Sequence, residues 1–193
     1  MIKAILFDAD GVMLKKQGVW FSLRYAKERG VPPEKIEAFF KGAFRDVQTG
    51  RGDLLQELAP HLKGWKWDGT IEEFVRAWQE GDTVVDQEMV ELVRRLRGNG
   101  IRCYLATDQD SYRARYISET LGFGVLFDDC FFSYEIGHRK CEKEFFEIIL
   151  RRLDLPAEKV AYWDDDQENV TIALSLGIQA RFFTGIKELE KEL

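Results

Sequence analysis

Two acidic residues, Asp8 and Asp10, directly follow an apolar run and are the first candidates for chemistry in this sequence. The run from Ile2 to Phe7 predicts a buried strand, and Gly11 marks a turn after it. The carboxyl edge of an open α/β sheet is the usual place for a ligand in such folds. The two acids are therefore candidate catalytic residues. On this stretch alone, a turn and a helix cap is the alternative interpretation.

Polar residues also stand at the ends of other predicted strands. Thr107 ends one strand, Asp164 and Asp165 end another, and Lys140 lies in a loop that precedes a helix. Because the carboxyl ends of parallel strands share one edge of the sheet, we expect acids, a hydroxyl and an ammonium to converge there.

Phosphoryl transfer through a carboxylate is the chemistry that fits this set. Clustered carboxylates repel each other, and oxygen ligands without histidine or cysteine favour Mg²⁺ as the compensating ion. Asp8 would attack phosphorus, while the metal, Lys140 and the backbone amides of residues 9–11 would offset the developing charge. Asp10 would protonate the leaving alcohol and later take a proton from the hydrolytic water.

The elements that position these residues follow from the hydrophobic pattern. After the first strand the chain reads as helical for roughly seventy residues, and from Val84 strands and helices alternate. The alternation predicts an α/β fold, with a parallel sheet covered by helices on both faces. The strands are expected at 2–7, 101–107, within 127–133, at 160–163 and at 178–183, with helices at 111–121, 141–153, 170–176 and 186–193. We expect a core of 1–14 and 84–193, with an α-helical cap, 15–83, inserted as a lid.

Composition excludes several classes of partner. The chain has 193 residues, and 34 acids exceed 28 lysines and arginines to give a formal charge of −6. No basic stripe is present, so nucleic acid and anionic membranes are not expected partners. The apolar windows are too short for a signal peptide or a membrane span, and three cysteines without metal-binding spacing indicate reduced thiols. A cytoplasmic location is the resulting expectation.

Four segments, in order and spacing, resemble the signature motifs of the haloacid dehalogenase-like (HAD) hydrolase superfamily. They are FDADGV, LATDQ, the lysine within GHRKCEKEFF, and YWDDDQENV. The helical insert resembles the cap of the superfamily's type I branch, and the last motif with its small-residue helix resembles phosphatase-like members. The resemblance implies a Rossmann-like core.

The resemblance also implies a role for each matching residue. Asp8 matches the nucleophile, and Asp10 matches the general acid and base, whose main-chain carbonyl also binds Mg²⁺. Thr107 and Lys140 match the groups that bind the phosphoryl oxygens. Asp164 and Asp165 match the acidic pair that, with Asp8 and Asp10, holds the metal, and Asp165 is the stronger candidate for direct ligation. Asn169 is expected to support the metal site indirectly, by contacting a residue that binds the metal.

Two positions depart from the family pattern. Many relatives carry Asn where this chain has Asp108, and Pro where it has Cys141. Asp108 adds a negative charge to the predicted phosphate site. It either points away from the phosphate or favours a substrate with hydroxyl or cationic groups. Asp10 argues against a true dehalogenase, whose reaction has no alkoxide to protonate.

Other charged residues carry weaker signals. Arg45 and Arg51 in the helical insert are possible substrate-specificity contacts, although surface placement is an equal interpretation. Lys15 and Lys16 either meet the substrate or form a solvated hinge, and we expect His138 to be solvated.

We therefore predict a hydrolase, a Mg²⁺-dependent phosphatase that acts on a small phosphorylated metabolite through an aspartyl-phosphate on Asp8. A phosphomutase, for example on a hexose phosphate, shares every motif and differs in the acceptor. A non-catalytic phosphate-binding or regulatory protein is the third possibility. The sequence leaves the substrate and the oligomeric state open.

Overall fold

The computed structural model describes residues 1–16 and 18–192, so Gln17 of the expected cap and Leu193 of the expected terminal helix lie outside the described residues. Its centre is a five-stranded parallel sheet in the order β3-β2-β1-β4-β5. The predicted α/β fold with a parallel, Rossmann-like sheet is confirmed. The strands are β1 (Ala4–Phe7), β2 (Arg102–Thr107), β3 (Asp129–Phe132), β4 (Val160–Asp164) and β5 (Gln179–Phe182).

The central strand is β1, and its neighbours are β2 on one side and β4 on the other. Phe7 pairs in register with Leu105 of β2 and with Trp163 of β4. The chain builds outward from β1 first through β2 and β3, and then in the other direction through β4 and β5. The strand order therefore reverses between β1 and β4, which is where ligands bind in open parallel sheets.

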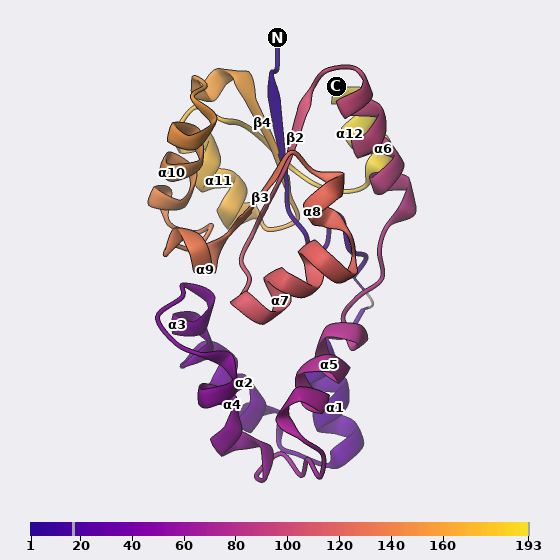
Figure 1. The fold of residues 1–193 in the computed structure, drawn as a ribbon, viewed down its shortest axis with the longest axis vertical. Helices are drawn as coiled ribbons and strands as arrows, with labels where there is room; N and C mark the ends of the chain where they lie inside the picture. Colours follow the sequence, from indigo (N-terminus) through magenta and orange to yellow (C-terminus); the bar gives the residue numbers. More distant parts are fainter. Residues whose placement is uncertain (17, 193) are drawn as a thin grey trace.

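Alternate residues of the strands face two hydrophobic clusters, one on each face of the sheet. Ile5 and Phe7 face one cluster, and Ala4 and Leu6 face the other, all fully buried. The first face is covered by α6 (Gln87–Gly98), α7 (Ser111–Arg115), α8 (Phe123–Leu126) and α12 (Ile186–Glu192). The second is covered by α9 (Ser133–Ile136), α10 (Lys143–Leu153) and α11 (Gln167–Ser175), as Figure 1 shows.

Local geometry differs from the expected elements in a few places. The expected helix 111–121 changes into a π-helical segment, Tyr116–Thr120, after α7. A short 3-10 turn, Ala157–Lys159, precedes β4. The first strand begins at Ala4, although the Lys3 amide still donates to the Lys159 carbonyl at 2.8 Å. The later start of the first strand is within the one or two residues by which element boundaries commonly differ.

The helical insert has a hydrophobic core of its own. Its helices are α1 (Phe21–Arg29), α2 (Pro33–Lys41), α3 (Phe44–Gln48), α4 (Leu54–Leu62) and α5 (Ile71–Gly81). Trp65 is the largest side chain of this core and is 2% exposed, with its ring centroid 5.7 Å from those of Phe39 and Phe74. Thr70 and Glu73 form a capping box that begins α5. None of the helices within the described residues is long and apolar enough to cross a membrane.

The insert lies over the carboxyl edge of the sheet, with α3 near α9 and α5 near α7 (Figure 1). Beside α9, the Ser133 hydroxyl donates to the Gln48 carbonyl at 2.6 Å. Gly50 has a φ of +73°, and a Cβ there would overlap the carbonyl of Tyr134. Beside α7, Arg113 donates to the carbonyl of Gln79, at the C-terminal end of α5, at 2.9 Å. The sheet edge and the insert therefore meet on both sides of the space between them.

Candidate functional site

A buried ion-pair cluster lies where the strand order reverses. Asp8 directly follows β1, Asp164 ends β4, and Lys140 lies in the loop between α9 and α10. The Lys140 ammonium is 2.7 Å from Asp8 Oδ1 and 2.8 Å from Asp164 Oδ2. The three residues are between 0% and 4% exposed. The structure thus brings together residues from three distant segments of the sequence.

Burial and charge act in opposite directions on this cluster. Burial raises the pKa of Asp8 well above its ordinary value, and the charge of Asp164 adds to this, while Lys140 opposes it. Burial alone would lower the pKa of the Lys140 ammonium, but Asp8, Asp164 and Asp108 outweigh it and raise that pKa. Lys140 therefore stays charged, and additional positive charge at the cluster would favour the ionised form of Asp8.

Asp164 is held by donors from β4 and α11. Tyr162 donates its hydroxyl to Asp164 Oδ2, and Asn169 Nδ2 lies 3.1 Å from the same oxygen. The amide of Asp166 donates to the other oxygen at 2.7 Å. Burial raises the pKa of the Tyr162 phenol well above its usual range, so the hydroxyl remains a donor. These bonds fix the orientation of Asp164 and, through it, that of Lys140.

Asp165 lies against the turn that follows β1. Gly11 has a φ of +89°, and a Cβ at this position would overlap the Asp165 carboxylate. Lys16 forms an ion pair with Asp165, and Lys15 lies 3.5 Å from Asp86, so both lysines of the linker to the insert are paired. Glycine at position 11 is what allows the Asp165 carboxylate to approach the first motif.

Asp8, Asp164 and Asp165 each offer a carboxylate oxygen, and these oxygens lie within 4.8 Å of one another. The donor set is all oxygen, two of the acids are buried, and a lysine ammonium touches each of the three. Hard carboxylate ligands at this spacing suit Mg²⁺, which also compensates their mutual repulsion. The residues therefore fit a divalent cation.

Asp10 is oriented by side chains that the sequence patterns did not single out. Gln109 Nε2 donates to Asp10 Oδ2 at 2.7 Å and contacts Thr107 Oγ1 at 3.1 Å. Arg113 Nη2 lies 3.5 Å from Asp10 Oδ1. Gln109 thus connects the candidate acid to the buried hydroxyl of Thr107 at the end of β2.

Asp108 points toward the Lys140 loop. Its carboxylate accepts a hydrogen bond from the Lys140 amide at 2.9 Å and from Arg139 Nε at 3.3 Å. Burial raises its pKa, and Lys140 opposes this. These contacts hold the Lys140 loop, and Asp108 also lines the adjacent cavity, so both interpretations of this departure stay open.

A cavity of about 540 Å³ lies between the sheet edge and the insert. Asp10, Asp108, Gln109, Asp110 and Arg113 line its end at the sheet, and helices α1 to α5 and the segment before α1 form the rest of its wall. A ligand bound next to Asp10 can therefore extend into the cavity under the insert.

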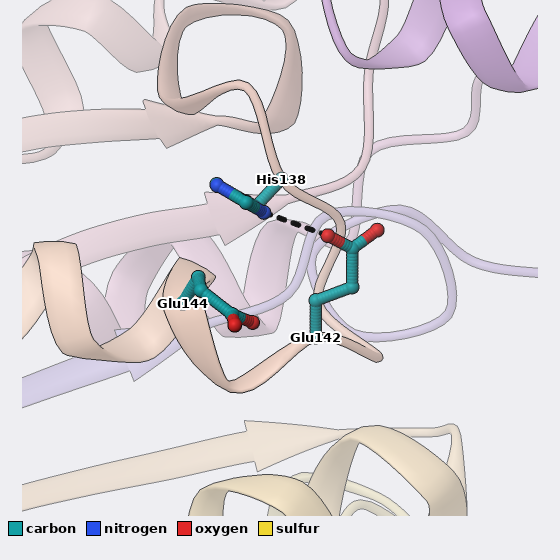
Figure 2. A group of neighbouring side chains, drawn as sticks. All are labelled: His138, Glu142 and Glu144. Carbon is teal, nitrogen blue, oxygen red and sulfur yellow. Dashed lines mark hydrogen bonds and ion pairs between the residues drawn. The ribbon is translucent and has the colours of Figure 1, made fainter.

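The structure does not bring Arg45 and Arg51 to this cavity. Both are exposed, and Arg51 pairs with Asp46 at 2.9 Å. His138, expected to be solvated, is half-buried, and its Nδ1 lies 2.7 Å from Glu142 Oε2. Figure 2 shows these two residues with Glu144 at the start of α10.

Four residues of the site were not predicted from the sequence: Gln109, Arg113, Ser133 and Tyr162. Two of them carried a usable signal, because Gln109 lies inside the second motif and Tyr162 is two residues before Asp164, on the same face of β4. Arg113 and Ser133 carried none, since each bonds both to the core and to the helical insert, and these partners are distant in sequence.

Comparison with known proteins places this geometry in a family. A model of the haloacid dehalogenase-like hydrolases matches residues 2–177. A phosphorylated carbohydrates phosphatase of Thermotoga maritima is 26% identical over 185 residues, which is 92% of this chain and 83% of that protein. A sesquiterpene phosphatase of Aspergillus oryzae is 33% identical over 93 residues, 48% of this chain and 47% of that protein, so the match spans about half of its length.

A solved structure has the same fold. The HAD family enzyme of Bacteroides thetaiotaomicron, in complex with magnesium and inorganic phosphate, superposes with a TM-score of 0.80 over 94% of each chain, at 20% identity. The family match covers most of the chain and confirms the resemblance to the haloacid dehalogenase-like hydrolases that the four motifs indicated. The protein belongs to the haloacid dehalogenase-like hydrolases.

Proposed function

We propose that the protein is a Mg²⁺-dependent phosphatase that hydrolyses a phosphorylated small molecule through an aspartyl-phosphate on Asp8. The observation that carries the proposal is the buried Lys140 ammonium between Asp8 and Asp164, beside Asp165 at the point where the strand order reverses. Residues 1–14 and 84–193 would form the catalytic core, and 15–83 the cap that closes over it.

The three clustered carboxylates of Asp8, Asp164 and Asp165 would hold the Mg²⁺, together with the main-chain carbonyl of Asp10. When bound, the ion supplies positive charge that offsets the repulsion between a phosphate dianion and Asp8. Asn169 supports this set because it donates to Asp164.

The chain's own residues divide the reaction between them. An Asp8 oxygen attacks phosphorus and the bond from phosphorus to the alcohol oxygen breaks, while Lys140 and the Thr107 hydroxyl stabilise the phosphoryl oxygens. Asp10 gives its proton to the departing alkoxide. It then removes a proton from a water molecule that attacks phosphorus, which releases inorganic phosphate and restores the Asp8 carboxylate. Gln109 and Arg113 hold Asp10 in place for both proton transfers.

The relatives support a phosphate ester as substrate and differ in the alcohol. The Thermotoga maritima and Aspergillus oryzae proteins are named as phosphatases of phosphorylated carbohydrates and of sesquiterpenes. The magnesium and phosphate bound in the Bacteroides thetaiotaomicron enzyme support the same ligands here. The alcohol must therefore be identified from this chain's own cavity.

Hydrolysis of p-nitrophenyl phosphate, measured with Mg²⁺ and with EDTA, tests the proposal. We expect turnover with the metal only, release of inorganic phosphate, and a loss of at least a hundredfold in kcat for Asp8→Asn. Asp46→Asn is the matched control, because Asp46 is an exposed acid that pairs with Arg51. Metal-independent turnover, or full activity of Asp8→Asn, would contradict the proposal. Isomerisation of hexose phosphates without release of free phosphate would identify a phosphomutase instead.

A further inference from the structure

We propose that the substrate is the phosphate monoester of an apolar alcohol, whose hydrocarbon part occupies the cavity under the helical insert. The inference rests on the proposed function, since Asp10 must donate its proton to the oxygen that joins the alcohol to phosphorus. Asp10 lines the cavity, and so the carbon skeleton of the leaving alcohol extends from Asp10 into the space beyond it.

The wall that this skeleton meets is apolar and aromatic. Trp20 precedes α1, Leu23 lies on α1, Phe40 on α2, Phe44 at the start of α3 and Trp78 on α5. Trp20 is 46% exposed and Leu23 is 36% exposed, although both are large apolar side chains. When an apolar ligand covers apolar side chains that face a cavity, the burial of their surface from water favours binding.

The charged side chains of the wall are already engaged within the protein. Glu37 and Lys41 pair with each other at 2.6 Å, and Asp82 accepts from the Phe21 amide at 2.6 Å. Arg113 donates to Thr83 Oγ1 at 2.7 Å as well as to the insert's backbone.

The two carboxylates nearest the sheet are engaged in the same way. Asp110 accepts the amides of Tyr112 and Arg113 at the start of α7, and Asp108 accepts the Lys140 amide. The polar side chains that remain in the wall are the neutral Ser22, Gln48 and Gln79. A polyol chain would lose its bonds to water and would meet these few neutral side chains in exchange, whereas a hydrocarbon chain has no such bonds to lose.

The shape and size of the cavity agree with one such ligand. Its volume of about 540 Å³ falls within the range of roughly 300 to 1,000 Å³ typical of pockets for small organic molecules. Asp10 and Gln109 line the cavity from the side of the sheet, and Phe40, Phe44 and Trp78 line it from the helices of the insert. This polarity matches a molecule with a phosphate at one end and a hydrocarbon body at the other.

A series of n-alkyl phosphates from ethyl to octyl tests the inference, with p-nitrophenyl phosphate as the reference. We expect kcat/KM to rise roughly threefold for each added methylene until the cavity is filled. Two pairs are matched in carbon number: n-propyl phosphate with glycerol 3-phosphate, and n-pentyl phosphate with ribitol 5-phosphate. In each pair we expect the alkyl ester to be hydrolysed at least tenfold more efficiently.

The outcomes separate the two proposals. Turnover of p-nitrophenyl phosphate with a flat chain-length series, or with polyol phosphates preferred, would overturn the apolar substrate and leave the phosphatase intact. Failure to hydrolyse any ester, the reference included, would overturn both.

A pair of leucine variants locates the effect. Leu23 and Leu174 are both exposed leucines on helices, but of the two only Leu23 lines the cavity. We expect Leu23→Ser to reduce the octyl-to-ethyl ratio of kcat/KM by at least threefold, and Leu174→Ser to leave that ratio unchanged. Equal ratios in the two variants would place the hydrocarbon outside this cavity and contradict the inference.

Discussion

The ammonium of Lys140 lies 2.7 Å from Oδ1 of Asp8, and both residues are 4% exposed. Asp164 shares the same ammonium. Removing Lys140 would therefore leave two buried carboxylates without the cation that compensates them. This relationship links catalysis to stability, because the charge that prepares the candidate nucleophile also makes its burial tolerable.

Lys140→Met is expected to lower the free energy of unfolding by about 3 to 5 kcal/mol, the usual cost of leaving a buried charge unpaired. Chemical denaturation with and without Mg²⁺ measures this loss. The added metal should recover more stability in the variant than in the native chain, because it replaces part of the missing positive charge. Lys41→Met, which removes an exposed lysine, should change stability by less than about 1 kcal/mol. A stable, active Lys140→Met protein would refute this account.

Gly11→Ala is expected to weaken Mg²⁺ binding by at least tenfold, measured by calorimetric titration. A Cβ at position 11 would overlap the Asp165 carboxylate, and the φ of +89° is strained for alanine. Gly100→Ala separates these effects, because Gly100 has a φ of +81° with no atom within 4 Å of an added Cβ. The positive φ should cost each variant about 1 kcal/mol of stability, and the steric overlap should make the loss larger for Gly11→Ala. If their Mg²⁺ affinities are the same, Asp165 does not bind the metal.

Arg113→Gln is expected to lower kcat by ten- to a hundredfold. Arg113 contacts Asp10 and also bonds to Gln79 and Thr83 on the insert. Its loss would leave the Asp10 carboxylate less fixed and would remove bonds between α7 and the end of the insert. Thr83→Val removes one of these bonds and spares the contact with Asp10, so its kcat should stay within about twofold of the native value. Equal values of kcat in the two variants would show that Arg113 does not position Asp10.

Stability is expected to fall above pH 9 because of the thiol of Cys103. Burial raises its pKa from 9.0 to about 12. The folded-state pKa lies above the unfolded value, so the contribution of the protonated thiol is complete below pH 9 and is lost as the pH rises toward 12. The loss amounts to about 1.4 kcal/mol for each pH unit.

Thermal or chemical unfolding of Cys103→Ala between pH 8 and pH 11 measures this contribution. Its stability should fall less steeply with pH than that of the native chain, whatever the offset caused by the smaller side chain. Parallel curves for the two proteins would show that another group causes the alkaline loss.

The sequence alone was enough to predict the sheet and the residues at its carboxyl edge. When strands and helices alternate along a chain, the strands pair in parallel. The residues that follow Phe7, Ala106 and Trp163 must then lie at one edge of the sheet. The position of Lys140 followed from its place in a loop at the same edge. These relationships depend on the hydrophobic periodicity of each segment and on the order of strands and helices, and both can be read from the sequence.

Tertiary structure decided how the acids are held and what lies beyond them. The bonds of Gln109 and Arg113 to Asp10, and the placement of Arg51 with Asp46 outside the cavity, depend on how the helices of the insert pack. The way helices pack depends on the shapes of side chains that are distant in sequence. No periodic pattern in the sequence reports which of these side chains meet. The two aspartates after the first strand therefore indicated the proposed reaction, and the packing of α1 to α5 over them determined the cavity beside Asp10.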